Sequence, residues 1–139
     1  LSFSPAAAQE LSVLAAAVRE ILALSLRAFE QQDAAAASDI EPLEEVIDTL
    51  KEQLRTRHIL RMQQGTCSIE AGFVLSDLLT DLERTSDHCS NIAGCIIDAA
   101  RHSLSLHETL RETRGESSDF RRKFRAYADK YRLGAVQSI

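Results

Sequence analysis

With 139 residues, of which 45% are hydrophobic and 27% charged, the chain can form one domain with a substantial core. Five Gly, two Pro and seven aromatic residues (two Tyr and five Phe) stand among runs rich in Ala, Leu, Glu and Arg, so we expect an all-α fold. The formal net charge of −5 lacks the basic footprint of a nucleic-acid binder, and no nucleic-acid partner is expected.

The cysteines and the hydropathy of the sequence exclude further classes of protein. Cys67, Cys89 and Cys95 are odd in number and lack C-x-x-C spacing, which argues against a disulfide framework or a structural zinc site. We expect them to be reduced and mostly buried. The most apolar stretch, residues 11–29, is interrupted by charges, so no direct membrane insertion of this segment is expected. Because the sequence opens with Leu1, we expect it to be a piece of a longer chain.

The first predicted helix begins at Ser4-Pro5, a polar cap followed by a proline, and continues to about Gln32. Residues 33–38 are predicted to break it. The helical stripe consists of Leu11, Leu14, Val18, Ile21 or Leu22, Ser25 and Phe29.

A second helix is predicted to begin at Ser38 or Asp39 and to end at Gly65, and a third begins after the cap Ser68 and reaches about Ala100. A polar stretch, 103–118, loosens the pattern before a C-terminal helix at about 117–133. Short connections between long amphipathic helices indicate an antiparallel up-down bundle. We therefore expect a single domain, 1–139, with a core repeat at about 5–104.

Two acidic pairs with i,i+4 spacing are the strongest candidates for a functional site. Glu44 and Asp48 lie on the second helix, and Glu83 and Asp87 lie on the third. Both pairs are at similar offsets from their apolar stripes, and folding the helices about Gly65 sets 48 opposite 83 and 44 opposite 87. The four carboxylates are thus predicted to meet in a metal-capable cluster for Fe, Zn, Mn or Mg.

The alternative is that basic side chains neutralise these acids, since Lys51 and Arg55 lie on the same flank of the second helix. Asn91, one turn beyond Asp87, is a candidate to support the ligands. His88 follows Asp87 directly but points away from the apolar stripe, so it could reach a metal only if the helices twist. His58 falls in the apolar stripe, where we expect a core histidine with a backbone partner.

Asp77 and Asp81 have the same i,i+4 spacing but lie on the opposite flank, so we expect them to pair with Arg55 and Arg57.

Residues 43–97 resemble the PhoU family, specifically the PhoU-like cytoplasmic tails of bacterial sodium/phosphate cotransporters. The resemblance is strongest in residues 77–93, which contain a Glu-Arg-x-x-Asp-His-x-x-Asn-Ile run; weaker support comes from residues 43–48, 58–62 and 65–68. It implies a three-helix repeat whose Glu/Asp-x-x-x-Asp motifs can hold metal ions. The motif residues that carry over are Glu44, Asp48, Glu83 and Asp87.

The resemblance also implies a regulatory or interaction role in phosphate uptake. Free-standing members of the family carry two repeats and this chain has one, which favours a tail at the cytoplasmic face of the bacterial inner membrane. Its expected partner is the membrane transporter portion of the same polypeptide, and a second copy of the chain (a homodimer) is a further candidate.

Two alternatives stay open. The first is a free-standing PhoU-like regulator of phosphate signalling that binds metal. The second is a carboxylate di-metal enzyme, but such sites use Glu-x-x-His motifs and no Glu here has His three residues later. Without a nucleophile–base constellation either, we expect no catalysis.

Overall fold

A computed structural model describes residues 2–102 and 106–135, with side chains described outside 106–117. The described chain is helical throughout, without a strand. Its elements are α1 (Pro5–Gln31), α2 (Ala34–Ala37), α3 (Ile40–Gln63), α4 (Ile69–Arg101) and α5 (Leu106–Lys130). None of these helices combines the length and the apolar character that crossing a bilayer requires.

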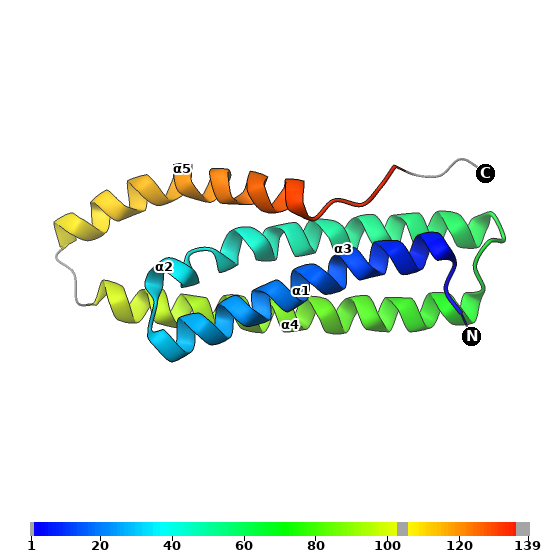
Figure 1. Cartoon of the computed structure of the whole chain (residues 1–139), viewed down its shortest axis with the longest axis horizontal. Helices are drawn as coiled ribbons and strands as arrows, with labels where there is room; N and C mark the ends of the chain where they lie inside the picture. Colours follow the sequence, from blue (N-terminus) through cyan, green and yellow to red (C-terminus); the bar gives the residue numbers. More distant parts are fainter. Residues whose placement is uncertain (1, 103–105, 136–139) are drawn as a thin grey trace.

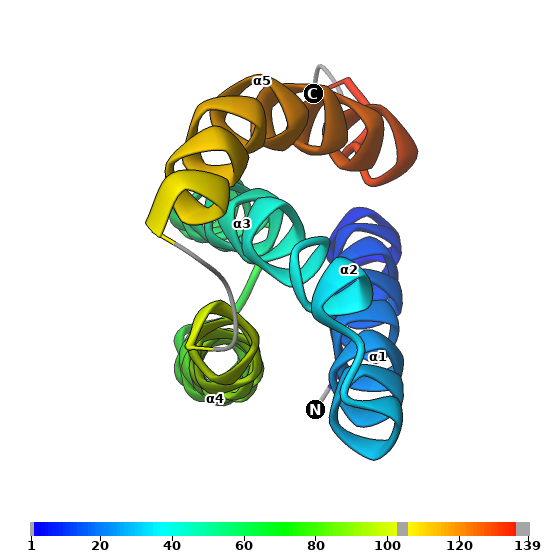
Figure 2. The same ribbon diagram turned by 90° about the vertical axis from the view of Figure 1, so that its left-hand side faces the viewer.

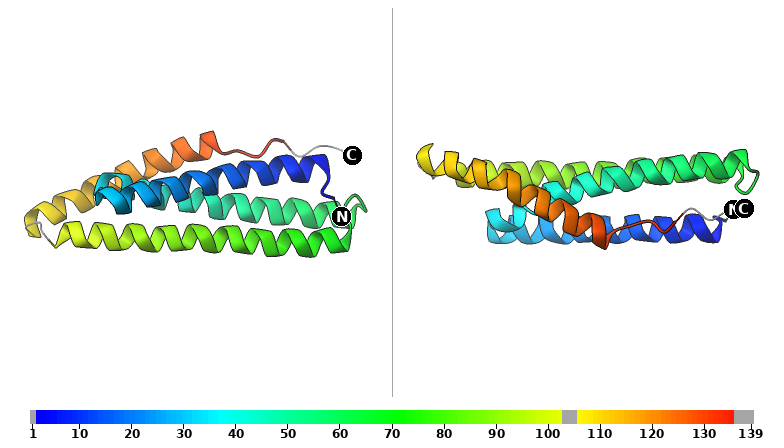
Figure 3. Two further views of the ribbon diagram at one scale, coloured as in Figure 1. Left: turned by 60° about the horizontal axis from the view of Figure 1, so that its bottom comes forward. Right: turned by 90° about the horizontal axis from the view of Figure 1, so that it is seen from above.

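Three long helices, α1, α3 and α4, pack against one another in a triangular bundle, and α5 lies along the outside of α3 (Figures 1 and 2). Successive long helices run in opposite directions, so that α1 and α4 are parallel and α3 is antiparallel to both. Figure 3 shows α5 crossing over α3 towards α1. The predicted all-α, antiparallel up-down bundle is confirmed.

The helix ends follow the capping residues that the sequence contains. Ser4 Oγ accepts a hydrogen bond from Ala7 N at 3.1 Å, and Ser68 Oγ accepts one from Ala71 N at 3.1 Å. Gly65 has a φ of 75°, which an L side chain adopts only with strain, and this allows α3 to turn sharply into α4.

The predicted break after the first helix is confirmed, because α1 ends at Gln31 and Gln32 has a left-handed φ of 50°. Within this break the short helix α2 forms, capped by Asp33 Oδ1, since alanines continue a helix readily once it is capped. Two other local predictions were wrong. The C-terminal helix begins at Leu106 instead of about 117, since one glycine within a helix is tolerated. Phe29 is 61% exposed, and Ala28 takes the buried place on α1.

The core is an aliphatic seam along the inside of the bundle. Its fully buried large residues come from the three long helices: Leu14, Ile21, Ile40, Leu43, Ile47, Leu54, Leu75 and Leu79. Because side chains four residues apart lie above one another on a helix, Leu50 and Leu54 of α3 form one buried row, and Leu75 and Leu79 of α4 form another at a similar level. This seam fixes which residues of α3 and α4 face each other.

A buried ion-pair group joins α1 to the end of α3. Glu10 accepts from Arg57 Nη1 at 3.0 Å and from Arg61 Nη2 at 2.9 Å, and its side chain is only 9% exposed. Sequence reasoning missed this group, because Glu10 and the arginines are about 50 residues apart in the chain and nothing local connects them.

Polar contacts join the outer helix α5 to Asp39, at the start of α3, and to Glu20 of α1. Lys123 Nζ lies 2.8 Å from Asp39 Oδ1, and Tyr131 donates its hydroxyl hydrogen to Glu20 of α1, which also pairs with Lys130. The exposed helix α5 therefore covers the groove between α1 and α3. Asp119, Phe120 and Lys123 of α5 also line a hollow with Glu41 of α3 and Asp98 of α4, at one end of the α3–α4 groove.

Truncation of one core leucine tests this packing. Leu14→Ala should lower the free energy of unfolding by about 2–5 kcal/mol, because Leu14 is fully buried and its loss leaves a cavity. Urea unfolding followed by circular dichroism measures the change. Leu26→Ala on the same helix is the control, since Leu26 is 59% exposed. Equal losses in the two variants would contradict the assigned face of α1.

Candidate metal centre

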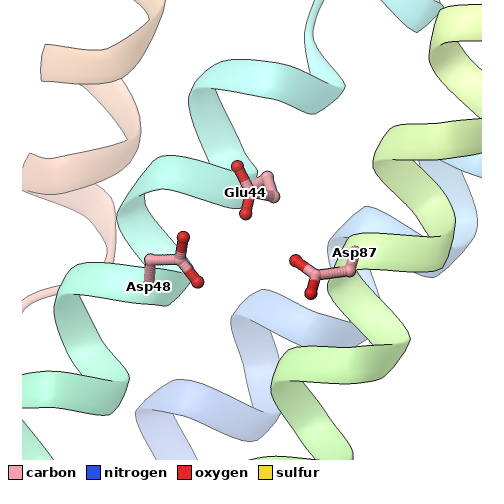
Figure 4. Close-up of side chains that lie close together, drawn as sticks. All are labelled: Glu44, Asp48 and Asp87. Atoms are coloured by element: carbon pink, nitrogen blue, oxygen red, sulfur yellow. The ribbon is translucent and has the colours of Figure 1, made fainter.

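Three carboxylates meet in the groove between α3 and α4. One oxygen each of Glu44, Asp48 and Asp87 lies within 4.8 Å of the other two. Figure 4 shows Glu44 and Asp48 projecting from successive turns of α3 towards Asp87 on α4. Glu44 and Asp48 are half-buried, and Asp87 is exposed.

The local sequence explains why these three side chains converge. Glu44 and Asp48 are one helical turn apart and therefore point the same way from α3. The sharp turn at Gly65 reverses the chain, so that positions whose numbers sum to roughly 131 lie at the same level on α3 and α4. Asp87 is thereby brought opposite Glu44, as the fold-over register predicts.

Glu83, the fourth predicted member, makes a different contact. Its Oε1 lies 2.6 Å from Lys51 Nζ, and Lys51 is 8% exposed, so a cation of the protein already neutralises this carboxylate. The alternative of pairing with Lys51 thus describes Glu83, whereas the trio Glu44, Asp48 and Asp87 contains no ion pair within the described residues. Arg55, the other suggested partner, lies 3.3 Å from Glu52.

The negative charges of the trio are not balanced by a positive side chain among the described residues. The pKa of Glu44 is raised to about 8, first because burial disfavours the charged carboxylate. A hydrogen bond with Asp48 and the negative charges of Asp48, Glu45 and Glu41 act in the same direction. Asp48 Oδ1 is buried and has no hydrogen-bond partner among the described residues. A buried oxygen without a donor is costly, and a cation would satisfy it.

The two residues expected to support the ligands lie outside the trio. His88 is exposed on α4 next to Asp87. Asn91 lines a hollow with Phe29 and Ile96, on the side of α4 that faces α1. A role for either residue beside the acids stays a prediction.

The predicted pairing of Asp77 and Asp81 with Arg55 and Arg57 was wrong. Both aspartates are exposed, and Arg57 instead binds Glu10. The i,i+4 spacing alone does not distinguish this solvated pair from Glu44 and Asp48. What distinguishes Glu44 and Asp48 is that α4 brings a third carboxylate, Asp87, beside them.

His58 is a core histidine, as expected, but its neighbour is a thiol. Cys67 Sγ lies 3.6 Å from Nε2 and 3.7 Å from Nδ1, whereas no backbone partner of the ring is seen in the described part of the chain. Burial and then the charge of Arg61 lower the pKa of His58. All three cysteines are free, and only Cys89 is buried, so the expectation of mostly buried cysteines was wrong.

Comparison with known proteins agrees with this architecture. A family profile described as the PhoU domain matches residues 11–96, more than half of the chain. The chain belongs to the PhoU family. The matched region contains most of α1, all of α3 and nearly all of α4, so the three carboxylates lie inside the PhoU domain and α5 lies outside the match.

One relative of this PhoU domain is the phosphate-specific transport system accessory protein PhoU homolog 1 of Thermotoga maritima. The two are 26% identical over 89 residues, which are 64% of this chain and 38% of the relative. The chain thus matches less than half of the relative's length. No solved structure gives a significant match.

The raised pKa of Glu44 predicts how the stability of the metal-free PhoU domain depends on pH. The folded state holds this proton up to about pH 8, whereas the unfolded chain releases it near the ordinary glutamate pKa of 4.5. The free energy of unfolding should therefore fall as pH rises through this window. Thermal unfolding in EDTA across pH 5–9 measures the fall.

Glu44→Gln should flatten this pH profile, because an amide keeps the shape without the titrating proton. Glu45→Gln is the control, since Glu45 is exposed on the same helix. If both variants retained the slope of the unsubstituted domain, Glu44 would not be its source.

Proposed function

We propose that this PhoU domain is a regulatory module of phosphate transport that holds a divalent cation on Glu44, Asp48 and Asp87. The observation that carries the proposal is the convergence of three carboxylates around a buried oxygen of Asp48 that lacks a donor. An all-oxygen ligand set suits hard or borderline cations such as Mg, Mn and Fe, with Zn as a further candidate. Glu83 is left out, because Lys51 already satisfies it.

A bound cation would supply charge neutralisation and a link between two helices. Its ligands come from both α3 and α4, so binding would stabilise the folded bundle by mass action and release the proton that Glu44 holds. This suits a regulatory role, because the conformation of the α3–α4 groove would then respond to cation supply. We propose no catalytic role for the trio.

The phosphate context rests on family membership and on the relative named as an accessory protein of phosphate-specific transport. We propose that this PhoU domain is the cytoplasmic tail of a bacterial sodium-dependent phosphate cotransporter. The resemblance of residues 43–97 to such tails and the match to only 38% of the relative support this form. A free-standing regulator fits the family match equally well. The complete reading frame decides: a block of apolar spans upstream of Leu1 supports the tail, and a second soluble repeat contradicts it.

Metal content tests the cation site. The domain purified without a nickel column or chelator should contain near-stoichiometric Fe, Zn, Mn or Mg by elemental analysis. Asp48→Asn/Asp87→Asn should lose that metal and the metal-dependent rise in melting temperature, because two of the three ligands become neutral amides.

Asp77→Asn/Asp81→Asn is the matched control, since this pair has i,i+4 spacing and lies exposed on α4. Glu83→Gln should keep its metal, because Glu83 binds Lys51. Absence of metal from every form, with a melting temperature unchanged by added cations, would mean that the trio is structural. A domain whose metal disappeared with Glu83→Gln would instead have the four-carboxylate site.

A further inference from the structure

A hollow of about 190 Å³ lies between α3 and the end of α5. Its polar lining comes from Thr49, Gln53, Arg57, Tyr131 and Arg132, over a floor of Val46, Leu50, Phe124, Ala128 and Leu133. This is the region where α5 crosses over α3 and the chain continues beyond its last turn (Figures 1 and 3). No carboxylate lines the hollow among the described residues.

The positive charge behind this hollow is not balanced. Arg57 and Arg61 share the single carboxylate of Glu10, and their side chains are only 17% and 12% exposed. Two guanidinium groups and one carboxylate leave one surplus positive charge in a poorly solvated place. Arg61 Nε is also buried without a hydrogen-bond partner within the described residues, so Glu10 does not exhaust the donors of the pair.

Arg132 adds a second cation to the same hollow. It is exposed and forms no ion pair with any described residue, although the chain carries a net charge of −5. Glu20 of α1, close to the end of α5, is already bound by Tyr131 and Lys130. The hollow thus has a buried surplus charge on one side and an unpaired guanidinium on the other.

We propose that this hollow binds a small oxyanion, with phosphate or a phosphate monoester as the ligand class. Arginine presents its donors in a planar fork that matches phosphate oxygens, and Thr49 and Gln53 offer further hydrogen-bonding groups. The apolar floor lowers the local polarity beside these donors, which strengthens charge-assisted hydrogen bonds. The volume equals that of about six liquid-water molecules, enough for a tetrahedral anion with a small organic group.

The oxyanion site is independent of the proposed cation site. Residues 46, 49, 50, 53 and 57 lie along one side of α3, whereas Glu44 and Asp48 lie about half a turn around the same helix. An anion in the hollow therefore cannot be a ligand of a cation held by the trio. Either site can fail experimentally without the other.

Saturable stabilisation by phosphate tests the proposal. In EDTA, at fixed pH and ionic strength, inorganic phosphate and phenyl phosphate should each raise the melting temperature relative to chloride. Arg132→Gln should weaken the apparent affinity by about tenfold or more, the effect of losing one hydrogen bond to a charged group. Isothermal titration calorimetry measures the same loss of phosphate affinity directly. Tighter binding of phenyl phosphate would identify the apolar floor as part of the site.

Arg125→Gln is the matched control, because Arg125 is exposed on α5 and does not line the hollow. Asp48→Asn/Asp87→Asn should bind phosphate as the unsubstituted domain does, which separates this site from the cation site. The proposal is overturned if phosphate stabilises no more than chloride. It is also overturned if Arg125→Gln and Arg132→Gln weaken binding equally, since that result indicates general charge screening.

Discussion

The register between α3 and α4 is the constraint on which the candidate site depends. The sharp turn at Gly65 sets where the chain reverses, and the buried rows of Leu50, Leu54 and Leu75, Leu79 hold the two helices at one rotation. A shift of one residue would turn Asp87 by about 100° around α4 and remove it from Glu44. The polar site is thus positioned by apolar packing, and the packing tolerates the acids because they lie at the edge of the seam.

The same helix pair shows how a protein separates neighbouring carboxylates by their surroundings. Glu83 and Asp87 are one turn apart on α4, yet only Glu83 meets the amine of Lys51. Asp87 instead faces Glu44, whose pKa is raised to about 8 chiefly by burial. Glu83 is thus neutralised by Lys51 within the chain, whereas Glu44, beside Asp87, holds a proton in the absence of a cation.

Sequence periodicity predicted the long helices, their caps and the convergence of Glu44, Asp48 and Asp87, because these depend on local spacing and on a short connection. Periodicity could not exclude Glu83 from the metal-capable cluster, because the contact between Glu83 and Lys51 depends on how far the flexible Lys51 side chain reaches. Nor could it find Glu10 with Arg57 and Arg61, which pair across two helices far apart in sequence. The start of α5 was misplaced because a polar, glycine-containing stretch carries no apolar stripe to reveal a helix.

The central position of α3 has a consequence for the order in which the domain loses structure. α3 contacts α1, α2, α4 and α5, whereas α5 packs chiefly on α3 and is joined to the bundle by surface polar contacts. Backbone amides of α3 can therefore exchange with solvent only when the whole bundle opens, and those of α5 can exchange through a local detachment. That detachment would expose Val46 and Leu50 without disturbing the α3–α4 seam, so the domain has an outer helix that can be displaced while its inner bundle stays folded.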